Sequence, residues 1–128
     1  MHKYSFEKLD AWIEAKEFTK AVYQITNSFP DTEKFGLTSQ LRRASVSVCS
    51  NIAEGITRTS YKDRAHFMAI SYGSAIEVLN QLIISYELGF ILDQTYNELR
   101  NSLESISNKI NGLRNYYLRQ LNNNPPPK

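Results

Sequence analysis

The sequence predicts an all-α fold, an antiparallel up-down-up-down four-helix bundle. Apolar residues recur at steps of three and four through four long segments, which is the period of an amphipathic helix. Pro30, Gly55 and Gly89 separate these segments, and no run of alternating apolar and polar residues indicates a strand or hairpin. The connections are short, so successive helices should lie antiparallel. With 128 residues, the chain can form one domain that needs neither a disulfide nor a metal to fold.

The first helix is expected over residues 6–28. Its apolar stripe consists of Leu9, Trp12, Ile13, Phe18, Val22 and Ile25. Pro30 lacks a backbone N–H and disfavours helical geometry in the residue before it, so the helix should end there. The second helix is expected over residues 38–54. Thr38 is its predicted N-cap, and Gly55 suits the left-handed position that often follows a helix.

The third helix is expected over residues 60–88. Ser60-x-x-Asp63 resembles a capping box at its start, and Gly89 can reverse the chain at its end. Its apolar rows recur every seven residues, as Ala65, Tyr72, Leu79 and Tyr86 and as Met68, Ala75 and Leu82.

The fourth helix, residues 93–121, has the most regular pattern. Steps of three and four alternate along Tyr96, Leu99, Leu103, Ile106, Ile110, Leu113 and Tyr117. A mean period of about 3.5 predicts a left-handed bundle with crossing angles of about 20°. Residues 122–128 are polar and Pro-rich, and we expect them to form a disordered tail.

Charge is unevenly distributed, although the net charge is only +2. Residues 34–64 hold six Lys/Arg and two Asp/Glu, and residues 105–128 hold four Lys/Arg and no acid. Residues 1–33 and 65–104 are acidic on balance. The bundle should therefore have electrically distinct surfaces. The two interpretations are a nucleic-acid surface and ordinary solubilising charge.

The basic residues are the best candidates for ligand binding. The predicted nucleic-acid contacts are Arg42, Arg43, Arg58, Lys62, Arg64, Lys109, Arg114 and Arg119. Arginine offers a planar fork that suits phosphate, and Tyr61 or Tyr116 can stack on a base. The alternative is that Arg42 and Arg43 form salt bridges between subunits.

A second set of residues forms a polar motif within the helices: Asn51, Glu54, Gly55, Gly73, Ser74 and Glu77. Polar pairs of this kind can fix the register of packed helices, and we favour that role. Gly73 lies in mid-helix, where it should permit close helix packing. Glu77 is expected to bind an arginine of another helix or subunit. In the functional alternative, Glu54 orients Arg43 or Arg58 for a ligand.

Some apolar residues do not fit the bundle interior. Phe67 and Ile70 lie one turn apart, away from the main apolar rows, and Val46 lies on the polar side of its helix. We predict that Val46, Phe67 and Ile70 contribute to a subunit interface.

Several classes of function find no support in the sequence. A di-iron bundle needs two acidic-x-x-His pairs, whereas Asp63-x-x-His66 stands alone, so no metal or other cofactor is expected. The single Cys49 lies among small residues and suits packing better than reactivity. We expect no enzymatic activity. No signal peptide or membrane span is evident, so we expect a cytoplasmic protein without a membrane partner.

Several motifs carry a family resemblance. They are Leu41-Arg42-Arg43-Ala44, Asn51-Ile52-Ala53-Glu54-Gly55, Phe6-x-x-Leu9-x-x-Trp12 and Gly73-Ser74-x-x-Glu77. They resemble the four helix bundle protein family, first described as products of intervening sequences in bacterial 23S ribosomal RNA genes and often labelled S23 ribosomal protein. The resemblance covers residues 6–118 and implies a homopentamer around a central axis. The family is also similar to accessory bundle proteins of diversity-generating retroelements, which engage a reverse transcriptase and nucleic acid.

These observations lead to one preferred hypothesis and one alternative. The preferred function is a non-catalytic, oligomeric accessory protein that binds nucleic acid, in particular structured RNA, through phosphate contacts. The alternative is a protein-interaction scaffold whose arginines serve subunit contacts.

Overall fold

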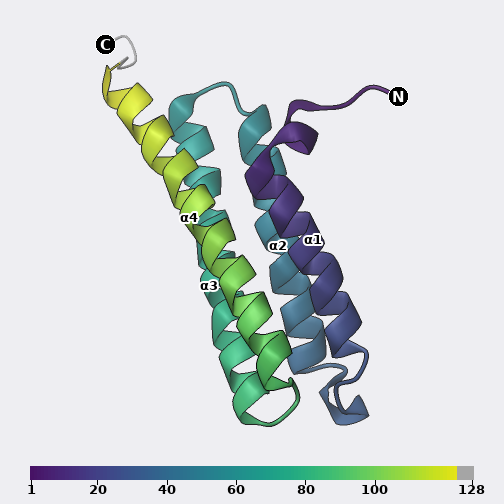
Figure 1. Cartoon of the computed structure of the whole chain (residues 1–128). Coiled ribbons are helices and arrows are strands. Elements are labelled where there is room, and N and C mark those ends of the chain that lie inside the picture. Colours follow the sequence, from purple (N-terminus) through teal and green to yellow (C-terminus); the bar gives the residue numbers. More distant parts are fainter. Residues whose placement is uncertain (124–128) are drawn as a thin grey trace.

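The computed structural model describes residues 1–123, which form a four-helix bundle (Figure 1). The helices are α1 (Asp10–Thr26), α2 (Leu37–Thr57), α3 (Tyr61–Glu87) and α4 (Asp93–Asn123). Short 3₁₀ helices, η1 (Ser5–Lys8) and η2 (Asp31–Glu33), precede α1 and α2. The four long helices run antiparallel to their neighbours in chain order, and no strand occurs within residues 1–123. The predicted fold class is therefore confirmed.

All four helices contribute side chains to one core. The largest fully buried apolar side chains are Val22, Leu41, Ile52, Met68, Val78, Leu82, Ile106 and Ile110. The stripe predicted for α4 is buried at every position except Leu113, which is partly buried against the core. Packing is most extensive between α2 and α3 and between α3 and α4, whereas α1 and α4 pack least extensively of the four neighbouring pairs. The α1–α4 seam is consequently the most open side of the bundle.

The predicted boundaries of α3 are confirmed to within one residue. The backbone N–H of Asp63 donates to Oγ of Ser60 at 3.1 Å, so Ser60 is the N-cap. Gly89 adopts the left-handed conformation with φ of 82°, as the chain reverses toward α4. Both ends are therefore determined by short-range signals, an N-cap serine and a left-handed glycine, that can be recognised in the sequence.

The first helix is shorter than predicted. Leu9 has an extended backbone, with φ of −84° and ψ of 124°, so a 3₁₀ turn precedes α1 in place of a continuous helix from residue 6. The ring of Phe6 packs edge-on against Trp12, with 5.0 Å between centroids. At its other end the helix stops at Thr26, two residues before the predicted end.

The prediction that Gly55 follows the second helix is wrong. Helix α2 continues to Thr57, and Gly55 is buried within it. A Cβ atom at Gly55 would lie 2.6 Å from Cε of Met68 and 2.8 Å from Cβ of Phe67. The residue is therefore required by the close approach of α3 and not by a left-handed backbone.

Two further boundaries differ from prediction. Thr38 is not the N-cap of α2, because the helix begins at Leu37 after Gly36, and Thr38 is buried in its first turn. Helix α4 extends to Asn123, so Asn122 and Asn123 belong to the helix and not to the predicted tail. The remaining tail, residues 124–128, lies outside the described residues.

The contact at Gly55 gives a test of the α2–α3 packing. We expect Gly55→Ala to destabilise the protein by about 1 kcal/mol or more, because overpacking costs about 1–3 kcal/mol and exceeds the gain in helix propensity. Gly112→Ala is the matched control, since a Cβ there meets no atom within 4 Å. It should stabilise α4 by up to about 1 kcal/mol. Urea unfolding measures both changes, and equal effects of the two variants would contradict the close contact.

Candidate nucleic-acid interface

One end of the bundle contains one terminus of each of the four long helices and most of the basic residues. We call it the basic end and define it as residues 1–12, 54–67 and 109–123, which lie together in Figure 1. It holds eight Lys/Arg and four Asp/Glu. The opposite, acidic end comprises residues 24–40 and 80–98, with five Asp/Glu and one lysine. The bundle is thus electrically polar along its length.

Arg64 connects the start of α3 to the last turns of α4. Its Nε donates to the backbone carbonyl of Arg58 at 2.7 Å, and its guanidinium lies 5.6 Å from the ring centre of Tyr117. Tyr61 stacks on the same ring, with 6.4 Å between centroids. Burial raises the pKa of Tyr117, and the nearby Arg64 charge opposes this shift. The two basic segments that the sequence displayed separately therefore meet around Tyr117.

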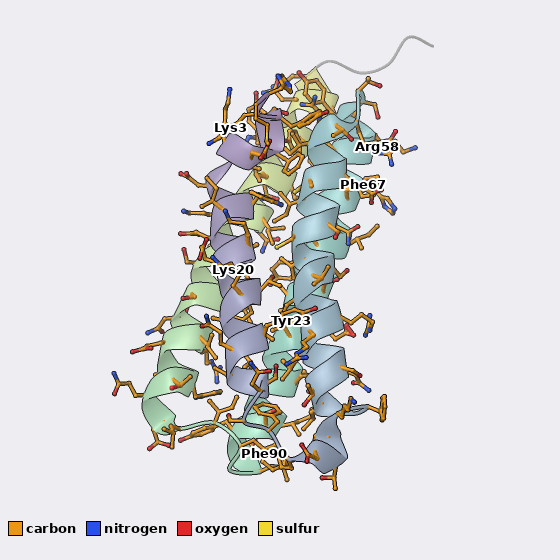
Figure 2. All side chains as sticks on the ribbon, turned by 90° about the vertical axis from the view of Figure 1, so that its right-hand side faces the viewer. Lys3, Lys20, Tyr23, Arg58, Phe67 and Phe90 are labelled. Atoms are coloured by element: carbon orange, nitrogen blue, oxygen red, sulfur yellow. The ribbon has the colours of Figure 1, made fainter. Side chains whose placement is uncertain are left out.

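Arg58 is held by contacts to its own neighbours. Its guanidinium lies 4.7 Å from the ring centre of Phe67 and 4.0 Å from the carboxylate of Glu54. Figure 2 shows Arg58 and Phe67 on the same side of the basic end. Phe67 is consequently half-buried beneath an arginine and is less available for a subunit contact than predicted. Glu54 lies near Arg58 and not near Arg43.

The remaining basic candidates are either unpaired or held in an ion pair within the bundle. Lys62, Arg114 and Arg119 form no ion pair with any residue in the range 1–123. Lys109, in contrast, lies 3.0 Å from Glu14 and helps to join α4 to α1, together with a hydrogen bond from Ser105 to the same carboxylate. The charge of Lys109 is thus partly neutralised by Glu14 within the bundle.

Arg42 faces the end of α1, near the acidic end of the bundle. It donates to Oγ1 of Thr26 at 2.9 Å, to the carbonyl of Tyr23 at 3.3 Å and to Oδ1 of Asn27 at 3.1 Å. Its guanidinium also lies 4.7 Å from the ring centre of Tyr23. These bonds satisfy acceptors at the C-terminal end of α1, where helices leave carbonyls unpaired. Arg42 therefore fixes α1 against α2.

The polar motif joins α2 to α3. Arg43 forms an ion pair with Glu77 at 2.8 Å, as expected for Glu77, and Ser47 hydrogen-bonds Ser74 at 2.9 Å. Asn51 donates to the carbonyl of Ser47 at 2.8 Å and to its Oγ at 3.1 Å, so both of these hydrogen bonds lie within α2. Because these contacts recur along one seam, they fix the register of the two helices.

The outer side of α3 carries apolar residues that the bundle leaves uncovered. Ile70 is 40% exposed and Ile84 is 42% exposed, and Val46 on α2 is 41% exposed. Gly73 lies between these isoleucines, and a Cβ there would meet no atom within 4 Å. The prediction that Gly73 serves close packing between helices of one chain is therefore wrong. By length and composition alone α3 is apolar enough to cross a membrane, yet only 33% of its most apolar window is buried in the bundle.

Neither a metal site nor a reactive thiol emerges. Within residues 1–123, no three His, Cys, Asp or Glu side chains are grouped closely enough to hold a metal ion. Cys49 is half-buried, with Sγ 3.4 Å from Oγ1 of Thr19. Burial raises the pKa of this thiol, which lowers the fraction of reactive thiolate at neutral pH.

The sequence profile of the 23S rRNA-intervening sequence proteins matches residues 7–112. The chain belongs to this family. A solved structure has a similar fold: a protein of unknown function from the S23 ribosomal protein family of Bacteroides thetaiotaomicron. It is 19% identical, superposes with a TM-score of 0.73, and the match covers 81% of this chain and 97% of the other. No curated protein matches the chain.

The family match covers only part of the basic end. It includes Arg58, Lys62 and Arg64 and ends before Arg114 and Arg119. This member of the 23S rRNA-intervening sequence proteins therefore combines a basic turn inside the family region with basic residues of α4 beyond it.

The two adjacent arginines of α2 should differ in their effect on stability. We expect Arg42→Ala to lower the free energy of unfolding by about 1–3 kcal/mol, because it leaves Thr26 and the end of α1 without their donor. Arg43→Ala removes an exposed ion pair and should cost about 0–1 kcal/mol. Urea unfolding of both variants measures the difference. A larger loss for Arg43→Ala would contradict this assignment.

Proposed function

We propose that this protein is a non-catalytic accessory protein of the cytoplasm that binds structured RNA with its basic end. The observation that carries the proposal is that Arg64 lies over the ring of Tyr117 and donates to the carbonyl of Arg58, which joins the basic start of α3 to the end of α4 that carries Arg114 and Arg119. The acidic end would repel a polyanion, so the charge distribution favours one orientation on RNA.

The chemistry of the basic end suits the RNA backbone. Arg58 and Arg64 are held by ring and carbonyl contacts, so less side-chain entropy is lost when they bind phosphate. Lys62 adds an exposed point charge in the first turn of α3. The deep major groove of A-form RNA is closed to side chains, and contacts to phosphates and 2′-hydroxyls therefore dominate recognition of duplex RNA. We expect little sequence readout.

The family name supports RNA as the ligand. It refers to an intervening sequence of 23S rRNA, which connects these proteins with structured RNA at the level of the gene. The resemblance of the family to accessory proteins of diversity-generating retroelements points in the same direction and would add a protein partner.

We further propose that the chain self-associates through the outer side of α3. Ile70, Gly73 and Ile84 lie uncovered there, and a glycine in mid-helix costs about 1 kcal/mol relative to alanine. A second copy approaching closely at Gly73 would account both for the exposed isoleucines and for the glycine in mid-helix. The family resemblance implies five copies, which would repeat the basic end five times.

The same uncovered face favours the alternative function, a protein-interaction scaffold. Arg42 and Arg43 both have partners within their own chain, so this alternative rests on the apolar residues of α3 and not on those arginines. The two functions differ in their dependence on salt, since only phosphate binding releases counterions.

A charge reversal tests RNA binding. We expect Lys62→Glu to weaken binding of a labelled RNA hairpin by about fivefold or more and to reduce the slope of log affinity against log salt by about 1. Fluorescence anisotropy across a salt series measures both. Lys34→Glu makes the same change of charge at the acidic end and should have little effect. Equal weakening by the two variants would show that net charge alone is responsible.

A second substitution tests self-association. We expect Ile70→Glu to shift the protein to a monomer, because it would place a charge in the proposed contact. Light scattering after size-exclusion chromatography measures the mass of the assembly. Ile13→Glu, on the exposed side of α1, is the control and should leave the assembly intact. A monomeric natural chain, or an unchanged assembly of the Ile70 variant, would contradict the proposal.

A further inference from the structure

A hollow of about 500 Å³ opens between the start of α1 and the last third of α4. Its apolar walls come from Leu9, Ala11, Leu113 and Tyr116. Its charged lining residues are Lys8, Asp10 and Lys109. The volume lies within the range of about 300–1,000 Å³ that is typical of small-molecule sites.

The hollow has two causes in the chain itself. The extended backbone at Leu9 turns η1 away from the axis of α1. On this side of the bundle, α1 and α4 pack less extensively than the other neighbouring helices do. Gly112 supplies no side chain, and a Cβ there would meet no atom within 4 Å. The space is therefore open where an ordinary helical residue would begin to fill it.

We propose that this hollow binds a single unpaired nucleotide of RNA, with its base against Tyr116 and its phosphate beside Lys8. The inference rests on the proposed function and specifies which part of an RNA the protein selects. A base has two flat apolar faces, and Tyr116, which lines the hollow, is a 46% exposed aromatic residue. Stacking of a base on one aromatic side chain changes affinity by about fivefold or more.

The charges of the hollow complement a nucleotide. Lys8 is exposed and forms no ion pair with any other residue up to Asn123, whereas Lys109 is shared with Glu14 at 3.0 Å. Lys8 is thus the main partner for phosphate. The carboxylate of Asp10 can accept a hydrogen bond from an exocyclic amino group, which adenine, cytosine and guanine have and uracil lacks. Uridine should therefore bind most weakly.

The hollow lies within the basic end, beside the basic start of α3. Tyr116 contacts Tyr117 with 5.6 Å between ring centroids, and Tyr117 in turn lies beneath Arg64. An RNA backbone along Arg58, Lys62 and Arg64 would thus pass close to the hollow. A bulged or terminal nucleotide could enter it while the adjoining duplex stays on the arginines.

Substitution of Gly112 separates this site from the rest of the surface. Two labelled RNA hairpins serve as probes, identical except that one carries a single bulged adenine. We expect the natural protein to bind the bulged hairpin about fivefold or more tightly than the paired one. Gly112→Trp should fill the hollow and remove this preference without weakening the paired hairpin. Gly112→Ala, which adds one methyl group, should retain the preference.

A second variant controls for indirect effects of the bulky tryptophan side chain. Tyr116→Leu keeps an apolar wall, removes the ring and should also remove the preference. If both variants retain the preference for the bulged hairpin, the hollow is not the nucleotide site, and the proposed function still stands.

Free AMP distinguishes the two proposals if neither hairpin binds. In that case the proposed function fails, and the hollow is tested alone by the amide NMR signals of Leu113 and Tyr116. Shifts of both signals with AMP in the natural protein, absent in the Gly112→Trp variant, would support the site. Unchanged signals would overturn it.

Discussion

The close contact between α2 and α3 is the constraint on which the other surfaces depend. At Gly55 the helices approach so closely that a methyl group would overlap Met68 and Phe67. Farther along the seam, Ser47 with Ser74 and Arg43 with Glu77 hold the same register. A slip of one helical turn, about 5.4 Å, would break all of these contacts together and move the start of α3 away from Tyr117. The basic end therefore exists only in this register.

The elements that the sequence predicted well are those defined by local signals. The spacing of apolar residues in α4 and the capping residues of α3 can be recognised in short stretches of sequence, and the structure has both helices where these signals predict them. The role of Gly55 cannot be recognised from the sequence, because glycine is suited both to a left-handed backbone and to a close neighbour, and only the packing of α3 distinguishes the two. The break at Leu9 is hidden for a similar reason, since its apolar side chain fits the stripe of a longer helix although its backbone is extended.

The candidate site could be predicted in composition but not in arrangement. The two basic segments were apparent from charge counts, whereas their meeting at one ring depends on contacts between residues more than fifty positions apart, such as Arg64 and Tyr117. Arg42 and Arg43 were treated alike because they are adjacent. Successive residues of a helix point about 100° apart, so one faces the end of α1 and the other faces Glu77 of α3. Adjacent arginines in a helix consequently have different partners.

The architecture places its surfaces on separate parts of the bundle. The core uses one face of α3 and leaves Ile70 and Ile84 outward, so association would not compete with packing. The basic end is formed by helix termini whose charged side chains point away from the core, although Gly55 and Phe67 of the same end belong to the α2–α3 contact. The hollow lies within the basic end, between α1 and α4, the neighbouring helices that pack least extensively. Because Ile70 and Ile84 lie outside the core and outside the basic end, a substitution there can change association while the α2–α3 register, and with it the fold, stays intact.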